Sequence, residues 1–386
     1  MRNRSMLLKT AGKKAGAALL AAAVTAGMLA GCGSEKDTIG GADGPTSVYV
    51  AEGNENEETA KEAEASQITQ ETAGDGAVYK VGIVQFVDDA SLNQINSALC
   101  EQLDAKGEEL GVTFDYADYN FNGQADSTML NQIAQQLIAE EVDVIIPIAT
   151  PAAVIMQAAT EDCRIPVVFS AVSDPEGAKL VASLEAPGSN VTGTSDALNT
   201  KAVMDLMFAA NPDIKTVGLL YNKSEDASRE PIEDAKAYCQ EKNVEVVEKT
   251  GTTNDEVMLA ADALTAAGVD AVFTPTDNTI MTAELAIYEK FTEAEIPHYG
   301  GADSFALNGA FCGYGVNYVE LGKATADMAA DILVNGKDPA AVPVVSLDNG
   351  IATVNTDTAQ EIGLDYSMFE GMCSELKEIT TAKEFE

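Results

Sequence analysis

Hydroxyl groups in the first half of the chain stand directly after apolar runs of strand length. Thr150 follows one such run and precedes a proline, so its hydroxyl and the backbone N–H groups up to Ala152 could hold a carboxylate. Ser170, Ser173 and Asp174 close the next run and offer further polar groups. The alternatives are an ordinary helix cap at Thr150 and a simple Asp-Pro turn at Asp174.

Polar side chains also end three apolar runs in the second half of the chain. Tyr221 and Asn222 close the first of these runs, Asp277 and Asn278 follow the second, and Asp303 follows the third. A carboxylate is the natural partner of a buried ammonium group, because an unpaired buried charge is costly. Asp277 is the first candidate for this role and Asp303 is the second. The alternative for Asp277 is a helix cap, since an apolar helix pattern begins three residues later.

Aromatic residues and the residues typical of catalysis give weaker signals. Phe86 stands directly after the first apolar run, where its ring could stack on an aromatic ligand or pack in the core, and the same alternatives hold for Tyr221. Motifs such as G-x-S-x-G, a Walker loop or a dinucleotide fingerprint are absent from the sequence. His298 is the single histidine. The cysteines that follow the N-terminal region are too scattered for a zinc site, at Cys100, Cys163, Cys239, Cys312 and Cys373. We therefore expect neither a metal nor a cofactor.

Alternating strand and helix patterns must position these residues. In the first half the patterns predict strands and helices in turn, at 79–86, 93–110, 112–119, 127–140, 142–148, 151–160 and 166–170. The same alternation restarts at 216 and continues to a helix at 318–333. The lack of hairpin signals indicates βαβ units and an α/β fold of two doubly wound, parallel-sheet lobes. Such lobes predict a ligand cleft beyond the carboxyl ends of their strands.

The N-terminus indicates export. Five basic residues precede an apolar stretch that ends in Leu29-Ala30-Gly31-Cys32, which has the features of a secretory signal at 1–31 and resembles a bacterial lipobox. In that family the cysteine is diacylated and becomes the first residue of the mature chain, so Cys32 is the expected lipidation site. The alternative is an ordinary signal with a chance cysteine. A spanning helix is disfavoured, because the apolar run is shorter than the ~20 residues that a bilayer crossing needs.

The charge of the chain narrows its partners. The signal region holds five basic and no acidic residues, so the mature chain carries 18 basic against 62 acidic residues, a net charge of −44. Binding to nucleic acid through phosphates is excluded on this balance, and so is attachment to anionic lipid through a basic patch. Residues 32–77 are polar, acidic and poor in apolar side chains, which predicts a disordered tether between anchor and head.

Six segments of the head resemble the ABC-transporter substrate-binding lipoproteins of the tryptophan/tyrosine uptake type. In order they read KVGIVQFVD, IATPAA, FSAVSDP, NVTGTSD, VGLLYNKSE and TPTDNTI, beginning at Lys80, Ile148, Phe169, Asn190, Val217 and Thr274. The resemblance spans residues 78–365. It implies a type I periplasmic-binding-protein fold whose lobes are joined by a three-crossing hinge, with lobe 1 at 78–195 plus 317–340 and lobe 2 at 196–316 plus 341–386.

The same resemblance implies a function. Such proteins bind a small molecule, often an aromatic or other hydrophobic amino acid, and deliver it to a membrane permease driven by an ATPase. We expect the candidate residues above to bind that ligand between the lobes, with Thr150 at its carboxylate and Asp277 at its ammonium group. The protein is expected to be a monomer, exported and held by the lipid on Cys32 at the outer face of the cytoplasmic membrane.

Three alternatives stay open at this point. The same head could report ligand state to a membrane kinase as a sensory receptor. An enzyme is a further alternative, which would use the cleft acids Asp174, Asp277 and Asp303. A sugar is an alternative ligand, although sugar clefts usually stack rings on several aromatic residues and this chain has no tryptophan.

Overall fold

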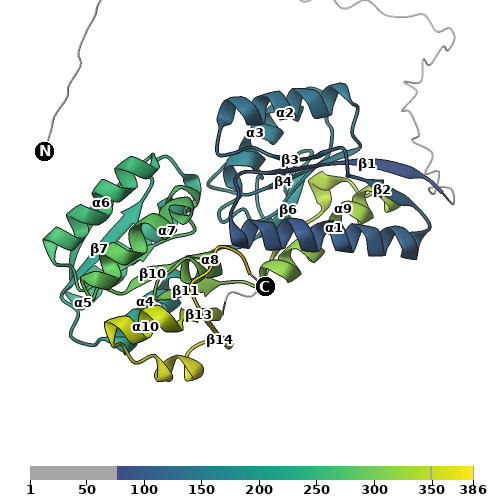
Figure 1. The fold of residues 1–386 in the computed structure, drawn as a ribbon. Coiled ribbons are helices and arrows are strands. Elements are labelled where there is room, and N and C mark those ends of the chain that lie inside the picture. The colour runs from purple at the N-terminus through teal and green to yellow at the C-terminus, as the bar shows by residue number, and fades with distance from the viewer. Residues whose placement is uncertain (1–75, 348–349, 386) are drawn as a thin grey trace, which may run out of the picture. The chain divides into compact units, whose positions relative to one another are not determined.

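The structure is a computed structural model that describes residues 76–347 and 350–385. The predicted signal at 1–31, the Cys32 lipidation site and residues 32–75 of the predicted tether lie outside the described residues. The described part of the chain is built around two β-sheets, each covered by helices on both faces (Figure 1). This is the α/β arrangement that the strand and helix patterns predict.

The first sheet, with its helices, forms lobe 1. Its seven strands run in the order β12-β6-β5-β4-β1-β2, β3 pairs with β1 as well, and every pair is parallel. The strands are β1 (Val78–Gln85), β2 (Thr113–Asp115), β3 (Asn120–Asn122), β4 (Val144–Ile148), β5 (Val167–Phe169), β6 (Val191–Ser195) and β12 (Val345–Ser346). Helices α1 and α9 cover one face, and α2 and α3 cover the other. The helices are α1 (Ala90–Leu110), α2 (Ser127–Ala139), α3 (Thr150–Thr160) and α9 (Tyr318–Asn335).

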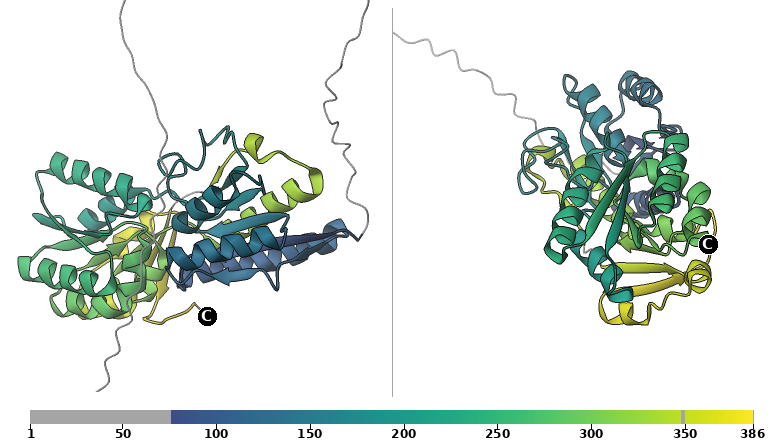
Figure 2. Two further views of the ribbon diagram at one scale, coloured as in Figure 1. Left: turned by 90° about the horizontal axis from the view of Figure 1, so that it is seen from above. Right: turned by 90° about the vertical axis from the view of Figure 1, so that its left-hand side faces the viewer.

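The second sheet forms lobe 2, in the strand order β14-β13-β11-β10-β9-β7-β8. The strands are β7 (Thr216–Tyr221), β8 (Glu245–Thr250), β9 (Ala271–Thr274), β10 (His298–Gly300), β11 (Cys312–Gly315), β13 (Ile351–Asn355) and β14 (Glu375–Ile379). Only the β11–β13 pair of this sheet is antiparallel among the described residues, a departure from the all-parallel prediction. Figure 2 shows the helices flanking both sheets from two further directions. Those of lobe 2 are α4 (Thr200–Ala210), α5 (Arg229–Lys242), α6 (Asn254–Ala267), α7 (Asn278–Glu293), α8 (Asp303–Leu307) and α10 (Thr356–Ile362).

Burial on both faces explains why the central strands read as continuous apolar runs. Every residue of β4 is buried, and so is the second half of β1. Capping then fixes where the helices begin. The Asp89 carboxylate accepts hydrogen bonds from the Ser91 and Leu92 amides at 2.9 and 3.3 Å, and α1 ends at Gly111 with φ 68°. The caps place the first residues of α1 at the carboxyl edge of the sheet.

Three crossings connect the lobes, as the family resemblance implies. The chain passes from β6 to α4, from β11 to α9, and from β12 to β13. One boundary differs from the prediction: β12 pairs with β6, so residues 345–346 belong to lobe 1, whereas the predicted lobe 2 included 341–386. A strand of two residues is too short to show an alternation of apolar and polar side chains. The sequence therefore could not predict to which lobe residues 345–346 belong.

The cysteines of the described part are free thiols, namely Cys100, Cys163, Cys239, Cys312 and Cys373. Burial raises the pKa of the Cys239 thiol to about 11 and that of the Cys312 thiol further, so both are protonated at neutral pH. Of the helices within 76–347 and 350–385, none is both long enough and apolar enough to cross a membrane.

Candidate ligand-binding site

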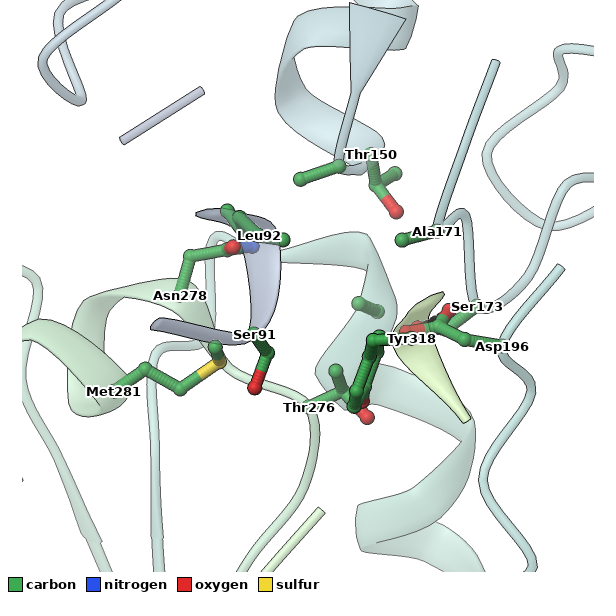
Figure 3. A pocket seen from close by; sticks show the side chains of 12 residues that line it. Ser91, Leu92, Thr150, Ala171, Ser173, Asp196, Thr276, Asn278, Met281 and Tyr318 are labelled. Atoms are coloured by element: carbon green, nitrogen blue, oxygen red, sulfur yellow. Dashed lines mark hydrogen bonds between the residues drawn. The ribbon is translucent and has the colours of Figure 1, made fainter. Parts of the chain in front are cut away.

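One pocket is lined by residues of both lobes, arranged around a common space (Figure 3). Lobe 1 contributes Ser91 and Leu92 from the start of α1, Thr150 from the start of α3, and Ser173 and Asp196 from the loops after β5 and β6. These positions follow the carboxyl ends of strands, where a doubly wound sheet binds its ligands.

The rest of the pocket comes from lobe 2 and from the second crossing. Thr276 lies after β9, and Asn278 and Met281 lie in the first turn of α7. Ala227 adds a small apolar surface from the loop after β7. Tyr318, the first residue of α9, lies between the two sets of side chains, so the pocket combines polar groups with an aromatic ring and apolar walls.

Thr150 opens α3 without a side-chain cap. The residue before it, Ala149, has φ 80° and ψ 152°, a conformation that non-glycine residues rarely adopt. The Ala149 amide donates a hydrogen bond to the Ser170 carbonyl at 3.0 Å. The first turn of α3 has no side-chain cap, and it lines the pocket together with the buried Thr150 hydroxyl. Free N–H groups at a helix start favour an anion, so this corner suits a carboxylate.

Asp196 supplies the negative charge of the pocket. Its carboxylate is 3% exposed and accepts a hydrogen bond from Ser173 Oγ at 2.9 Å. Burial raises its pKa to about 6, against the opposing effect of the Ser173 hydroxyl. The described residues that line the pocket include no Lys, Arg or His. A buried carboxylate with hydrogen bonds but without a cation suits the ammonium group of a ligand.

Tyr318 forms the aromatic wall of the pocket. It is 3% exposed, and Leu92 and Met281 line the same pocket with apolar side chains. Burial raises the pKa of its hydroxyl well above the ordinary value, and the carboxylates of Asp196, Asp303 and Asp89 act in the same direction. The ring therefore stays neutral and lies close to three acidic side chains.

Asp277, the first candidate for the ammonium group of the ligand, is a helix cap, which the sequence left open as the alternative. Its carboxylate accepts hydrogen bonds from the Thr279 and Ile280 amides, both at 3.1 Å, and from the Asn222 amide and Ser228 Oγ, both at 2.6 Å. Burial and the neighbouring Glu225 raise its pKa to about 8, and the bonds from Ser228, Asn222 and Ile280 oppose that rise. Asp277 is not among the residues that line the pocket. It holds the loop 222–228 onto α7 instead.

A second carboxylate fixes the pocket residue Asn278. Glu225 accepts hydrogen bonds from the Asn278 amide at 3.0 Å and from Asn278 Nδ2 at 2.9 Å. It also accepts from the Thr279 amide and hydroxyl at 2.9 and 2.8 Å. These bonds to Glu225 fix the position and orientation of Asn278 in the lining of the pocket.

The other predicted acids lie beside the pocket. Asp303 accepts hydrogen bonds from Ser91 Oγ and Gln94 Nε2, at 2.5 and 3.1 Å. Asp174 accepts from the Gly177 amide at 2.8 Å, which is the turn that its sequence favoured. Asp174, Asp277 and Asp303 therefore each stabilise a separate local structure. They do not converge on one reacting centre.

The predicted aromatic and amide residues of lobe 2 are also engaged elsewhere. Tyr221 packs in the core of lobe 2 and donates to Glu248 Oε2 at 2.7 Å. Asn222 donates through its amide to Asp277 and through Nδ2 to Thr279 Oγ1 at 2.8 Å. Neither residue lines the pocket, and both line a separate cavity with Lys223, Glu225 and Ser228.

Three predicted residues of lobe 1 also lie away from the pocket lining. Phe86 lines a second cavity together with Asn222 and Asn278, and Asn278 also lines the first pocket. Ala152, in the first turn of α3, is fully buried in the core of lobe 1. Ser170 accepts a hydrogen bond from Thr325 Oγ1 at 2.9 Å and is also fully buried.

Of the eleven predicted contact residues, Thr150, Ser173 and Asn278 line the pocket. Sequence reasoning did not select the other nine residues of this pocket, which are Ser91, Leu92, Ala149, Ala171, Asp196, Ala227, Thr276, Met281 and Tyr318. For Asp196 a signal was present, because it directly follows the strand β6 and closes the segment NVTGTSD that resembles the family. For Tyr318 none was, since it begins a helix rather than ending a strand.

Comparison with known proteins identifies the fold and the family. The family model described as ABC transporter substrate binding protein matches residues 80–369. The chain belongs to this family. It has the type I periplasmic-binding-protein fold, and proteins of this family bind substrates outside the cytoplasm and are not enzymes. The enzyme alternative built on Asp174, Asp277 and Asp303 is therefore excluded.

Several relatives are similar over nearly the whole head. A curated tyrosine-binding protein of Clostridioides difficile is 32% identical over 286 residues, which cover 74% of this chain and 81% of that protein. An ABC domain from Streptococcus pneumonia, solved in complex with L-Trp, is 31% identical with a TM-score of 0.72, over 78% of this chain and all of that chain. A ligand-free, open substrate-binding protein with adhesive properties from Clostridium difficile is 31% identical with a TM-score of 0.60, over 79% of this chain and all of that chain.

Proposed function

We propose that this protein binds an aromatic amino acid in the pocket between its lobes and delivers it to an ABC permease. One observation carries the proposal. The pocket sets a buried carboxylate without a cationic partner, Asp196, beside the uncapped start of α3 at Thr150. These are complementary sites for the two charges of an amino-acid zwitterion, and two of the relatives named above are a tyrosine-binding protein and a domain solved with L-Trp.

The charges of the ligand would be matched in the following way. Its ammonium group binds Asp196, which then becomes a paired buried charge rather than a lone one. Its carboxylate binds the free N–H groups and the hydroxyl of Thr150 at the positive end of α3. Ser173 supports the arrangement, because its hydroxyl already donates to Asp196 at 2.9 Å. A neutral sugar leaves Asp196 without a charged partner, so the site favours a zwitterion.

The side chain of the ligand would occupy the apolar part of the pocket. Tyr318 supplies a ring, and Leu92 and Met281 supply apolar surface. Methionine adapts to irregular shapes and contacts aromatic rings favourably. Thr276 and Asn278 lie on the lobe 2 side, where a phenol hydroxyl or an indole N–H finds a hydrogen-bond partner.

The proposal extends to how the protein is held at the cell surface. The signal at 1–31 directs export, the lipid on Cys32 anchors the mature chain, and the acidic residues after it tether the head. A doubly acylated cysteine suffices for stable anchoring, whereas one chain binds only marginally. The head then acts as a monomer and passes its ligand to a permease that an ATPase drives.

A thermal-shift series with the detergent-solubilised full-length protein tests the ligand. L-tyrosine, L-tryptophan and L-phenylalanine should each raise the melting temperature, because binding to the native state at a hundredfold excess over Kd adds about 2.7 kcal/mol of stability. Tyramine, which lacks the carboxylate, and 3-(4-hydroxyphenyl)propionate, which lacks the ammonium group, should shift it less. The absence of a shift with all three amino acids, or a larger shift with myo-inositol or arabinose, contradicts the proposal.

A further inference from the structure

Polar side chains in the first two turns of α1 bond across to lobe 2. Ser91 Oγ donates to Asp303 Oδ1 at 2.5 Å and accepts from the Ser304 amide at 3.1 Å. Gln94 Nε2 donates to the other oxygen, Asp303 Oδ2, at 3.1 Å. One carboxylate of α8 is thus held through both oxygens by α1. Ser91 also lines the ligand pocket, so a wall of that pocket is fixed by lobe 2.

The C-terminal segment 381–385 makes a second connection between the lobes. It is secured to lobe 2 beside α8, where the Ala382 amide donates to the Leu307 carbonyl at 2.8 Å and Asn308 Nδ2 donates to the Ala382 carbonyl at 2.9 Å. Two residues later, Glu384 accepts a hydrogen bond from Asn93 Nδ2 of α1, 3.2 Å from Oε2. Figure 1 shows this end of the chain beside α8 and α1.

Residues of lobe 1 fix the orientation of Asn93, the α1 residue of this second connection. Asn93 Oδ1 accepts from Gln85 Nε2 at 2.7 Å, and Asn93 Nδ2 donates to Asp88 at 2.9 Å. The orientation of Asn93 is therefore set without lobe 2. Next to it, Phe385 lines a groove between α1 and the start of α9. The segment 381–385 therefore packs on a surface of α1 and α9 that offers both a polar partner, Asn93, and a groove with apolar side chains.

We propose that Asp303 and Glu384 form a clasp, together with their α1 partners Ser91, Gln94 and Asn93, that keeps the lobes closed and sets how long the ligand stays bound. This rests on the proposed function, because it requires a ligand held between the lobes. Both carboxylates act as positioning groups. Neither lines the inner pocket, and each makes charge-assisted hydrogen bonds, which are stronger than neutral ones.

The clasp predicts a specific kinetic signature. Contacts that exist only when the lobes are closed contribute after encounter, so their loss accelerates dissociation and leaves association nearly unchanged. A residue needed only for folding would lower the melting temperature of the ligand-free protein without selectively changing the dissociation rate. The dissociation rate constant is therefore the readout that separates the two roles.

The test uses the full-length protein in detergent with L-tyrosine as the probe. Asp303→Asn keeps the shape of the side chain, and a chain that ends at Ala382 removes Glu384 and Phe385 but keeps the Ala382 bonds. The matched control is Asp262→Asn, an exposed carboxylate of lobe 2 that pairs with Lys290. Stopped-flow fluorescence should show a dissociation rate about tenfold higher in each test variant, an association rate within about twofold, and no change in the control.

Small-angle X-ray scattering adds a readout that needs no ligand. Without L-tyrosine, each clasp variant should have a larger mean radius of gyration than the unaltered protein, and the Asp262→Asn control should not. Unchanged dissociation rates together with an unchanged radius overturn the clasp. If L-tyrosine fails to bind the unaltered protein, the proposed function fails, while the scattering comparison still decides for or against the clasp.

Discussion

Replacing Asp196 by asparagine should separate ligand affinity from stability, because the two depend on opposite charge states of this carboxyl group. Asparagine keeps the size of the side chain and an oxygen that can accept from Ser173 Oγ. It removes the negative charge that we assign to the ligand ammonium group. Affinity for L-tyrosine should therefore fall, while the ligand-free protein should not lose stability.

The magnitudes follow from burial. The pKa of Asp196 rises from 3.8 to about 6, which corresponds to about 3 kcal/mol by which the folded protein disfavours the ionised form. A carboxyl group whose pKa is raised on folding stabilises the protein below its ordinary pKa, and this contribution is lost as the pH rises through 6. At pH 7.5 the ligand-free Asp196→Asn variant should thus equal the unaltered protein or exceed it by at most about 3 kcal/mol. Removing one partner of a buried charge pair should weaken binding by about 2–4 kcal/mol, or 30- to 1,000-fold.

Titration calorimetry with L-tyrosine at pH 5, 6 and 7.5 measures the effect. Below pH 6 the free carboxyl group is protonated and the ligand must displace the proton, so the affinity of the unaltered protein should fall up to about tenfold per pH unit. The asparagine variant should show weak binding that is flat over this range. Asp174→Asn, which removes a carboxylate that caps a turn outside the pocket, serves as the control. Binding by Asp196→Asn within threefold of the unaltered protein would refute the reasoning, and so would a parallel loss of affinity and stability.

Four further predictions concern the fold, its pH dependence, the pocket and the anchor. Asp277→Ala should lower the free energy of unfolding by about 2–4 kcal/mol in urea titrations, because it removes a cap and leaves the buried Asn222 amide unpaired; a change below 0.5 kcal/mol, on the scale of an ordinary surface substitution, would argue against the cap. The pKa values of Asp89 and Asp277 are raised to about 7 and about 8, so the folded protein should be most stable near pH 4 to 5 and lose stability as the pH rises through 8. A melting temperature that increases from pH 5 to pH 8 would contradict this. Tyr318→Ala should reduce L-tyrosine affinity about tenfold or more, whereas Tyr318→Phe should stay within threefold, and equal effects would remove the ring from the pocket. Cys32→Ala should move the protein from the washed membrane fraction to the medium, and retention on membranes would exclude the lipid anchor.

Local signals were sufficient to predict the alternation of strands and helices and the parallel pairing of the strands, apart from the antiparallel β11–β13 pair. The apolar run of β4 and the cap of α7 can be read from neighbouring residues, because burial of a strand and capping of a helix are set within a few positions of the chain. The same locality explains why the cap alternative for Asp277 was available from the sequence. Its four hydrogen bonds leave no free oxygen to aim at a ligand.

Long-range packing decided the residues that the sequence could not assign. Ser170 follows a strand as Ser173 does, but Thr325, which is 155 residues away in α9, covers it. Asp303 is engaged by Ser91, which is 212 residues away in lobe 1. Tyr318 reaches the pocket only because the second crossing delivers the start of α9 there. Such contacts depend on how distant segments pack within and between the lobes, which no spacing within one segment encodes.

A crystal structure of the complex with L-tyrosine tests the central claim most directly. We predict the ammonium group within hydrogen-bond distance of Asp196, the carboxylate at the start of α3 beside Thr150, and the ring between Tyr318 and Met281. L-tyrosine bound with its ammonium group away from Asp196, or seated in the second cavity beside Phe86, would contradict the account.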